Sequence, residues 1–477
     1  MPGGLAQIAA ALSPPALDLV GNPQFTNFSF VYKRPTNFST EFVAVPFDGS
    51  TRLDYGAPNT LVVSTLPRQG DLLLNAYLSF ELPDIYADDA SRFQWIDKVA
   101  CYLVREVRVK VGGQIIERMP GEWIDVQSEL TTPADKRVLW DRLTGNVPAL
   151  TSPTAPNNTV EVQNNELSYS PYPVGDRAAR KPSIRGRRVY LPLPLWFSKT
   201  PGHALPLIAL QGAPVEIDVD VRPWSELYVL WDAFSRRFYA PQLYPAGQAT
   251  ADGMYANTTT PGIGAFLETP QTGTVSIDLR AQLECEFGFL DAAERTSLAL
   301  TPRTMLIETV TPVRMTGLSG TCTQELLVSE PTRELVWMFR RVDALLNNEF
   351  TNLTASVPAD EGCPAMLTAT LLLNGAMRME PKPAAFFDTL QPLQHHSGAS
   401  RPGIHAWSFA LSPERPTPSG FIDLTSFERV ALQVALAPTT GARATLAGAG
   451  AQYQLDLFAV THNFLTTMNG VGGKKYV

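Results

Sequence analysis

Apolar and polar residues alternate with a period of two along several stretches of the chain. The longest run lies between Ser276 and Phe289, where odd positions are apolar and even positions are mostly polar. Shorter runs of the same kind occupy 215–221 and 452–459. Successive side chains of a β-strand point to opposite faces, so the pattern predicts strands with one buried and one wetter face. Antiparallel sheets are built from such strands, whereas the parallel sheets of α/β enzymes are buried on both faces. The sequence therefore predicts an all-β fold.

Turn dipeptides mark two tight hairpins. Gly112-Gly113 lies within the strand-like segment 107–116, and Asn374-Gly375 lies within 371–377. These residue pairs accept the positive φ angles that two-residue hairpin turns require. Helical patterns are rare by comparison. We expect short helices at Gly121–Leu130 and Asp291–Leu298.

The order of these features repeats in the two halves of the chain. Each half has a strand, a tight hairpin, a strand with a tryptophan, an alternating strand and a long final strand. The predicted strands are 71–82, 189–197, 215–221 and 277–290 in the first half, and 333–342, 404–411, 429–436 and 453–460 in the second. The repeat predicts two similar all-β units in tandem, with a boundary near Leu298–Arg303. Two irregular stretches, Thr131–Pro182 and Asp232–Gly273, are expected to be inserted surface loops.

Composition supports this organisation and argues against a nucleic-acid-binding role. The 477 residues are enough for two domains, each with its own core, and 40 prolines favour loops and sheet edges over long helices. The net charge is −8, and the first basic residue is Lys33. Apart from Lys474 and Lys475, neither end of the chain carries the clustered cations that phosphate contacts require. We therefore expect no direct nucleic-acid binding.

Cysteines and apolar runs give no sign of metal binding, secretion or membrane insertion. The four cysteines have no Cys-x-x-Cys spacing and are interpreted as reduced and mostly buried: Cys101, Cys285, Cys322 and Cys363. The apolar stretch Leu5–Leu12 has no basic leader before it, which argues against a secretory signal. No run approaches the roughly 20 apolar residues that span a bilayer. We expect synthesis in the cytosol.

Longer motifs then give the chain a family resemblance. They occur in one order from end to end: Gly21-Asn-Pro-Gln-Phe-Thr-Asn-Phe-Ser-Phe-Val-Tyr-Lys-Arg-Pro-Thr-Asn-Phe38, Gly70-Asp-Leu72, Val109-Lys-Val-Gly-Gly-Gln-Ile-Ile-Glu-Arg118, Gly121-Glu-Trp123, Leu191-Pro-Leu-Pro-Leu-Trp-Phe197, Pro201-Gly-His-Ala-Leu-Pro-Leu-Ile-Ala-Leu-Gln211, Phe289-Leu-Asp-Ala-Ala-Glu-Arg295, Leu306-Ile-Glu308, Arg333-Glu-Leu-Val-Trp337, Leu373-Asn-Gly375, Trp407-Ser-Phe-Ala-Leu-Ser-Pro413, Asn463-Phe-Leu465 and Gly470-Val-Gly-Gly473. With these motifs the chain resembles the major capsid proteins of the nucleocytoplasmic large DNA viruses. It departs from them at Lys474–Tyr476, where relatives are apolar, and in the two long inserts.

The resemblance implies a double jelly roll, that is, two tandem eight-stranded antiparallel sandwiches with long loop insertions and few short helices. Residues 1–25 would form an N-terminal arm, 26–298 the first jelly roll with insertions at about 131–182 and 232–273, and 299–477 the second jelly roll with the C-terminal tail. The implied function is structural: homotrimers form pseudo-hexagonal capsomers that tile an icosahedral virion shell. Implied partners are neighbouring capsomers, minor capsid and penton proteins, and the internal membrane layer, with assembly in the host cytoplasm.

Two other functions stay open at this point. The chain could be a minor capsid paralogue, or a carbohydrate-active β-sandwich protein. Neither the motifs nor the resemblance supplies catalytic, cofactor-binding or metal-binding residues. We expect Met1–Asn22, which is low in charge, to run along the inner base of the trimer and to touch neighbouring or minor capsid components.

Several residues invite a functional interpretation. Asn157, Asn257 and Asn352 begin Asn-x-Ser/Thr sequons in predicted loops and are possible glycosylation sites, whereas Asn27 and Asn37 lie in strand-like segments and are interpreted as chance matches.

Three further clusters have simpler structural interpretations. His395, His396 and His405 lack a nearby carboxylate or cysteine at metal-ligand spacing and are predicted to be surface or turn residues. Glu216, Asp218 and Asp220 resemble glycosidase carboxylates but alternate along a strand, which predicts a wet or interface-facing edge. Trp196, Trp337 and Trp407 lie in apolar segments and are predicted to be core residues instead of a sugar-stacking platform.

Overall fold

The computed structural model describes most of the chain. The described residues are 21–30, 32, 34–55, 60–88, 91–154, 159–163, 166–170, 172–232, 237–243, 262–271, 275–328, 330–357, 359–439 and 452–476, with 159–163 and 166–170 described by their backbone alone. The chain divides into two units, Met1–Phe38 and Ser39–Val477. In the first unit, Phe25, Phe28 and Phe30 are exposed. The helices and sheets described below lie in the second unit, except that β1 begins at Phe38.

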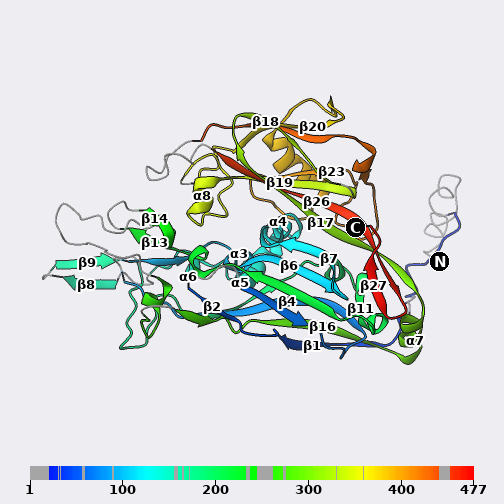
Figure 1. The fold of residues 1–477 in the computed structure, drawn as a ribbon, viewed down its shortest axis with the longest axis horizontal. Coiled ribbons are helices and arrows are strands. Elements are labelled where there is room, and N and C mark those ends of the chain that lie inside the picture. Colours follow the sequence, from blue (N-terminus) through cyan, green and yellow to red (C-terminus); the bar gives the residue numbers. More distant parts are fainter. Residues whose placement is uncertain are drawn as a thin grey trace, which may run out of the picture. The chain divides into compact units, whose positions relative to one another are not determined.

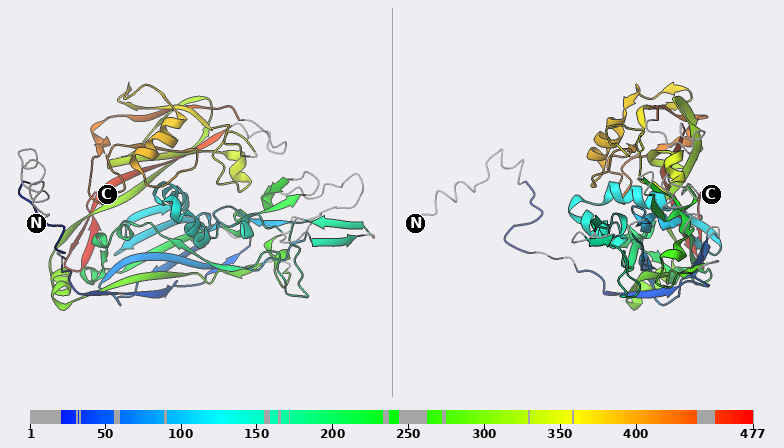
Figure 2. Two further views of the ribbon diagram at one scale, coloured as in Figure 1. Left: turned by 180° about the vertical axis from the view of Figure 1, so that it is seen from behind. Right: turned by 90° about the vertical axis from the view of Figure 1, so that its left-hand side faces the viewer.

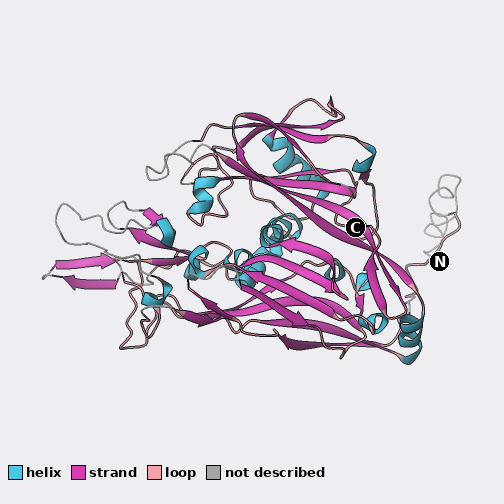
Figure 3. Cartoon of the chain, viewed as in Figure 1, coloured by secondary structure: helices cyan, strands magenta, loops and turns pink. Residues whose placement is uncertain are grey.

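Residues up to Leu290 form the first sandwich from two antiparallel four-stranded paths. One path, the β4 sheet, runs β1-β16-β4-β10, and the other, the β6 sheet, runs β3-β12-β6-β7. Their strands are β1 (Phe38–Pro46), β3 (Thr60–Thr65), β4 (Leu72–Leu82), β6 (Val104–Val111), β7 (Gln114–Pro120), β10 (Arg187–Pro192), β12 (Val215–Val221) and β16 (Gln282–Leu290). Figure 3 shows that strands dominate the fold.

The second sandwich begins at Arg303 and repeats this plan. Its β19 sheet runs β17-β26-β19-β23, and its β20 sheet runs β18-β25-β20-β21. Their strands are β17 (Arg303–Leu318), β18 (Thr321–Glu325), β19 (Pro331–Arg341), β20 (Met366–Leu373), β21 (Ala376–Met377), β23 (Ile404–Ser408), β25 (Val430–Leu436) and β26 (Tyr453–Met468). In Figure 1 this sandwich lies above the first one, and Figure 2 shows the pair from behind and from the side.

Strand order is the same in both sandwiches. When the eight path strands of each are ranked along the chain, one sheet reads 1-8-3-6 and the other reads 2-7-4-5 in both cases. This shared order confirms the tandem double jelly roll. Among the described sheets, no path combines strands from both sides of residues 291–302.

Shorter elements connect these strands. The short strands are β2 (Arg52–Asp54), β5 (Phe93–Trp95), β8 (Thr159–Gln163), β9 (Glu166–Ser170), β11 (Leu205–Pro206), β13 (Tyr228–Asp232), β14 (Arg237–Tyr239), β15 (Ser276–Asp278), β22 (Lys382–Pro383), β24 (Ile422–Asp423) and β27 (Val471–Lys474). The α-helices are α3 (Val99–Leu103), α4 (Gly121–Thr131), α5 (Ala134–Thr144), α6 (Pro148–Thr151), α7 (Ala292–Leu300), α8 (Val342–Leu346) and α9 (Gln391–His395). The remaining turns are 3-10 segments, namely η1 (Trp196–Ser198), η2 (Pro201–His203), η3 (Leu207–Leu210), η4 (Trp224–Glu226), η5 (Pro241–Leu243), η6 (Ile263–Phe266) and η8 (Leu424–Ser426), and a π-helical segment, η7 (Phe386–Leu390).

Local sequence explains the hairpins and helices that were predicted. The β6–β7 turn has positive φ at Gly112 (57°) and Gly113 (84°), and the β20–β21 turn has positive φ at Asn374 (51°) and Gly375 (80°). The predicted helices are confirmed as α4 and α7. The Asp291 carboxylate caps α7 by accepting a hydrogen bond of 2.8 Å from the Glu294 N–H.

Several predicted elements are wrong in detail. The run Ser276–Phe289 is not one strand, because the chain breaks between β15 and β16, where Arg280 takes a φ of 45°. The predicted strand 189–197 ends at Pro192, and Trp196 lies in η1 instead. Proline at 192 and again at 194 removes the N–H groups that would continue the ladder.

The two predicted loop insertions are more regular than expected. The stretch Thr131–Pro182 carries α5, α6 and the β8–β9 hairpin. The described part of Asp232–Gly273 carries β14, η5 and η6, and the rest of this stretch lies outside the described residues.

Two clusters of buried hydrophobic side chains form the cores of the sandwiches. One fills the second sandwich and includes Leu335, Trp337 and Phe339 of β19. The other fills the first sandwich and continues into the second, where it takes in Val336 and Met338. Alternate residues of β19 therefore serve two cores. The β19 sheet is buried on both faces, and the first sandwich lies against its outer face.

Candidate functional site

The junction between the two sandwiches contains buried charged side chains from both sides, among them Glu122, Asp125 and Arg340. From the first sandwich, α3, α4 and β7 face it, and from the second, β17, β26 and the segment after α8 do. Aromatic rings bridge the two sides. Trp123 lies 5.2 Å from Phe458 between ring centroids, and Tyr102 stacks on Phe350 at 5.1 Å.

A network of buried ion pairs crosses this junction. Glu122 of α4 accepts from Arg222 at 2.8 Å, from Arg314 at 3.1 Å and from Arg340 at 3.5 Å. Asp456 of β26 in turn accepts from both Arg314 and Arg340 at 2.6 Å. Glu122, Arg340 and Asp456 are each exposed by 2% or less. One carboxylate of the first sandwich thus holds two guanidinium groups of the second.

These carboxylates stay ionised despite their burial. Burial alone would raise the pKa of Glu122, but the guanidinium groups of Arg222, Arg340 and Arg314 outweigh it and lower that pKa. Burial would also raise the pKa of Asp456. The guanidinium groups of Arg340 and Arg314 outweigh burial, so that pKa is lowered as well. Neither carboxylate is therefore poised to donate a proton near neutral pH.

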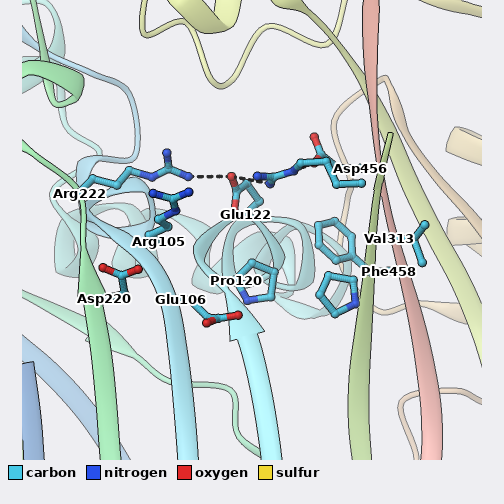
Figure 4. Close-up of a pocket in the computed structure, with 11 residues that line it drawn as sticks. Arg105, Glu106, Pro120, Glu122, Asp220, Arg222, Val313, Asp456 and Phe458 are labelled. Carbon is cyan, nitrogen blue, oxygen red and sulfur yellow. Dashed lines mark hydrogen bonds and ion pairs between the residues drawn. The ribbon is translucent and has the colours of Figure 1, made fainter. Parts of the chain in front are cut away.

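A cavity of about 530 Å³ adjoins this network. Figure 4 shows Glu122 between Arg222 and Asp456 at its edge. Its lining is Arg105, Glu106, Pro120, Glu122, Asp220, Arg222, Pro312, Val313, Arg314, Asp456 and Phe458, drawn from both sandwiches. Its carboxylates lie among three arginines, so the cavity resembles a solvated seam between two packed bodies more than a catalytic cleft.

A second network ties α4 to the loop after α9. Asp125 is fully buried and accepts from Lys98 at 2.5 Å, from the Tyr102 hydroxyl at 2.9 Å and from Arg401 of the second sandwich at 2.7 Å. Burial opposes ionisation of Asp125, but Arg401 and Lys98 lower its pKa well below the usual range. Glu129, one turn further along α4, pairs with Lys98 and Arg137.

A third network contains His396, one of the three histidines considered above as metal ligands. Glu308 pairs with Lys199 of the first sandwich and with Arg333, which also pairs with Glu334 at 3.0 Å. The His396 ring lies 3.3 Å from Glu334 and 3.4 Å from Glu414. Burial would lower the pKa of His396, but hydrogen bonds to the two glutamates raise it to about 9. His396 is therefore a charged member of the junction at neutral pH.

Comparison with known proteins identifies the family of this chain. A family model described as "Major capsid protein N-terminus" matches residues 26–257, and one described as "Large eukaryotic DNA virus major capsid protein" matches residues 294–473. The chain belongs to the major capsid protein family of large eukaryotic DNA viruses. Its role is structural, as a component of the virion shell, and the family is not enzymatic.

Individual relatives support the assignment over the whole chain. The major capsid protein of Phaeocystis pouchetii virus is 26% identical, and that of Paramecium bursaria Chlorella virus 1 is 27% identical, each over 100% of both chains. A solved structure described as the PBCV-1 virus capsid has a TM-score of 0.67 at 22% identity, and the match covers 95% of this chain and 100% of that one. This structural likeness confirms the double jelly-roll fold.

The three histidines were predicted to be surface or turn residues, and two of them have buried side chains. His396 lies in the segment directly after α9. The His396 side chain is 3% exposed and His405 is 2% exposed. His405 lies in β23 opposite Trp337, and burial lowers its pKa to about 3, so it is neutral in the folded capsid protein. His395 ends α9, and its Nδ1 lies 3.2 Å from the Leu411 carbonyl oxygen. In the described part of the chain, no cluster of His, Cys, Asp and Glu could hold a metal ion.

The predicted wet edge at Glu216, Asp218 and Asp220 is also wrong. Strand β12 lies between β3 and β6 and is not an edge strand. Asp218 is completely buried and pairs with Lys110 of β6 at 2.5 Å. The alternation marks a cross-strand ion pair on the sheet and not an acid/base pair.

The tryptophans and cysteines mostly follow the predictions. Trp196 and Trp337 are 2% exposed, as predicted for core residues, and Trp407 is partly buried against the core of the second sandwich. All four cysteines are free: Cys101 and Cys285 are buried, and Cys322 and Cys363 are partly exposed. Within the described residues, no helix has the length and apolar character needed to cross a bilayer.

The sequons lie in different settings. Asn157 and Asn257 lie outside the described residues. Asn352 is 5% exposed, its Nδ2 donates to the Ser356 carbonyl oxygen at 3.0 Å, and its Oδ1 accepts from the Thr354 N–H at 3.0 Å. In the folded chain its amide is therefore a structural group of the junction segment.

Sequence reasoning missed Glu122, Arg340 and Asp456, the centre of the buried network. One signal was present: Arg340 and Arg341 stand at the end of the apolar run 335–339. Charged residues in a strand that is otherwise apolar on both faces point to buried, paired charges.

Proposed function

We propose that this chain is the major building block of an icosahedral shell and assembles as a homotrimer with a pseudo-hexagonal outline. The observation that supports this proposal is the identical strand order of the two sandwiches within one chain. Two similar bodies per chain give six per trimer, so a true threefold axis produces nearly sixfold packing against neighbouring capsomers. We take residues 26–298 and 299–477 as the two structural domains and 1–25 as an arm.

The remaining partners follow from this role. We propose contacts with neighbouring capsomers, with minor capsid and penton proteins and with an internal membrane layer, and assembly in the host cytoplasm. Direct genome binding is not part of the proposal, because the net charge of −8 disfavours phosphate contacts. The arm, Met1–Asn22, would touch neighbouring or minor capsid components, so deleting residues 1–20 should leave trimers intact but impair shell assembly.

Light scattering coupled to size exclusion tests the proposal directly. The recombinant chain should elute with three times its mass of 52.1 kDa, and electron microscopy should show particles with a hexagonal outline. A stable monomer would contradict it. The alternative function is that of a minor capsid protein. Copy number in purified virions separates the two, because a major protein dominates the protein stain.

Glycosylation at Asn157 or Asn257 stays a prediction, and we propose that Asn352 is unmodified because its amide is buried and hydrogen-bonded. Intact-mass measurement before and after glycosidase treatment checks this. A glycan mapped to Asn352 by peptide mass spectrometry would contradict it.

A further inference from the structure

The two sandwiches have the same strand order but bury their equivalent sheets differently. In the second sandwich, ten of the eleven residues of β19 are buried, so this sheet is covered on both faces. Its equivalent β4, the third strand of the first sandwich, alternates between buried and partly exposed residues along much of its length. The β4 sheet therefore has an open outer face where the β19 sheet has a covered one.

The cover of the β19 sheet comes from the helix that follows the fifth strand of the first sandwich. This helix is α4, and its residues from Gly121 to Leu130 are all buried. Trp123 packs on Phe458 of β26, and Glu122 pairs with Arg340 of β19. Within one chain, therefore, the helix that follows the fifth strand of the first sandwich packs on the β19 sheet of the second, which is the sheet with strand order 1-8-3-6.

The equivalent helical segment of the second sandwich has no such cover within the described chain. It consists of η7 and α9, which follow β21 and β22. Leu390 is 39% exposed and Leu393 is 78% exposed. Leu411 is 79% exposed and lies on the adjoining loop, which is held to α9 through His395. We call these three leucines the helix patch.

The open face of the β4 sheet offers a surface of matching character. Phe42 of β1 is 60% exposed, and its ring lies 6.2 Å from that of Tyr77 on β4. Tyr190 of β10, at the opposite edge of the same sheet, is partly exposed and lines a cavity with Leu139 and Trp140 of α5, so it is not part of this surface. We call Phe42 and Tyr77 the sheet patch. Exposed aromatic residues on an otherwise well-packed sheet are typical of a protein interface.

We propose that the helix patch of one chain docks onto the sheet patch of a second copy. This contact between chains would be equivalent to the contact that α4 makes with the β19 sheet within one chain. The proposal rests on the trimer proposed above and names its surfaces. The two patches lie on different sandwiches, so the contact is head-to-tail. A head-to-tail contact closes into a ring when its rotation fits, and three copies close a ring in which every 1-8-3-6 sheet is covered.

Charged substitutions on each patch test this with light scattering. Leu393→Asp and Phe42→Asp should each give a monomer at a concentration where the unmodified chain is a trimer, because each buries an unpaired carboxylate in the contact. The matched control is Leu327→Asp, the same change at a leucine that is 83% exposed and lies outside both patches. It should remain a trimer. All three sites are exposed, so near-UV circular dichroism should match that of the unmodified chain. The Tm of the two monomeric variants should be lower than that of the trimer, because assembly itself stabilises the folded chain, whereas Leu327→Asp should keep the Tm of the unmodified chain.

Mixing the two variants gives a sharper readout. In a head-to-tail contact, the Leu393→Asp chain keeps an intact sheet patch and the Phe42→Asp chain keeps an intact helix patch. An equimolar mixture should therefore form a dimer with one productive contact, while each variant alone does not. Absence of any complex up to the solubility limit would overturn the pairing of these two patches.

Hydroxyl-radical footprinting separates the second copy from other occupants. Phe42 and Tyr77 should be protected in the trimer and reactive in the Leu393→Asp monomer. Protection that persists in that monomer would mean that another segment of the same chain covers the sheet, which overturns the inference. A trimer that survives both substitutions overturns the inference but leaves the proposed function standing. An unmodified chain that is not trimeric overturns both.

Discussion

Glu117 shows how one buried residue sets the pH response of the fold. It lies in β7, is 4% exposed, and its Oε2 accepts a hydrogen bond of 3.4 Å from the Trp196 N–H. Burial raises its pKa to about 8, in spite of the opposing effect of Lys199. The folded chain thus keeps this proton up to about pH 8, whereas an unfolded chain releases it near pH 4.5. Stability is therefore lost as pH rises through this window.

Replacing Glu117 with glutamine should remove that loss. We expect Glu117→Gln to match the unmodified chain at pH 5 within about 1 kcal/mol, because a protonated carboxyl and an amide are similar in shape and charge. At pH 9 the variant should be more stable by on the order of 4 kcal/mol, since each pKa unit corresponds to about 1.4 kcal/mol. Thermal unfolding at both pH values measures this difference.

The control is Glu361→Gln, the same change at an exposed glutamate. Its Tm should follow that of the unmodified chain at both pH values. Equal losses between pH 5 and pH 9 for Glu117→Gln and the unmodified chain would contradict the assignment of the buried proton. The pKa of His396 is raised to about 9, so its contribution to stability is also lost as pH rises. This loss is the same in the variant and in the unmodified chain, and it cancels in the comparison.

At the scale of single elements, α4 depends on a glycine. Gly121 opens this helix at the point where it leaves β7, and a Cβ there would lie 2.0 Å from the Val104 carbonyl oxygen and 2.4 Å from that of Cys101. Both atoms are backbone, so neither can rotate away. Position 121 therefore has to be glycine for α4 to lie against the start of β6.

Alanine at this position should displace the helix. We expect Gly121→Ala to lower the free energy of unfolding by roughly 3 kcal/mol, because the clash must be relieved by moving backbone. Chemical denaturation monitored by tryptophan fluorescence measures this. Gly202→Ala is the matched control, since a Cβ there has open space, and it should change stability by less than about 0.5 kcal/mol. Equal stability of the two variants would show that α4 adapts without cost.

Elements whose signal is local were predictable from the sequence. The Gly112-Gly113 turn and the alternation of 215–221 each depend on neighbouring residues, and both elements formed as expected. The break at Arg280 was not predictable, because a positive φ at arginine is imposed by tertiary packing. The same limit applied to the site. Alternation marked Asp218 as polar, but only the position of β12 between two strands makes it buried.

At the scale of the whole molecule, residues 39–477 should behave as one cooperative body. The larger hydrophobic cluster includes residues of both sandwiches, and three buried ion networks cross between them. Removing one sandwich would expose apolar surface and charges that the other now covers. We therefore expect calorimetry of the Leu393→Asp chain, which is proposed above to be a monomer, to show a single unfolding transition.

Arg340 is the residue through which this coupling can be tested. It is 1% exposed and pairs with Asp456 of its own sandwich and Glu122 of the other. Arg340→Met keeps much of the side-chain volume but leaves two buried carboxylates with fewer cations. Breaking a buried pair in this way costs about 3–5 kcal/mol, so Tm should fall and the two sandwiches should begin to unfold in separate steps.

The matched control is Arg429→Met, the same change in an exposed pair with Glu325 at 3.7 Å, where the expected cost is about 1 kcal/mol or less. Differential scanning calorimetry distinguishes the outcomes by peak number and by the ratio of calorimetric to van't Hoff enthalpy. A single peak at unchanged Tm for Arg340→Met would show that apolar packing alone unites the sandwiches. A split peak would show that the capsid subunit meets its neighbours as one rigid pair because buried charges, and not only apolar contacts, hold the pair together.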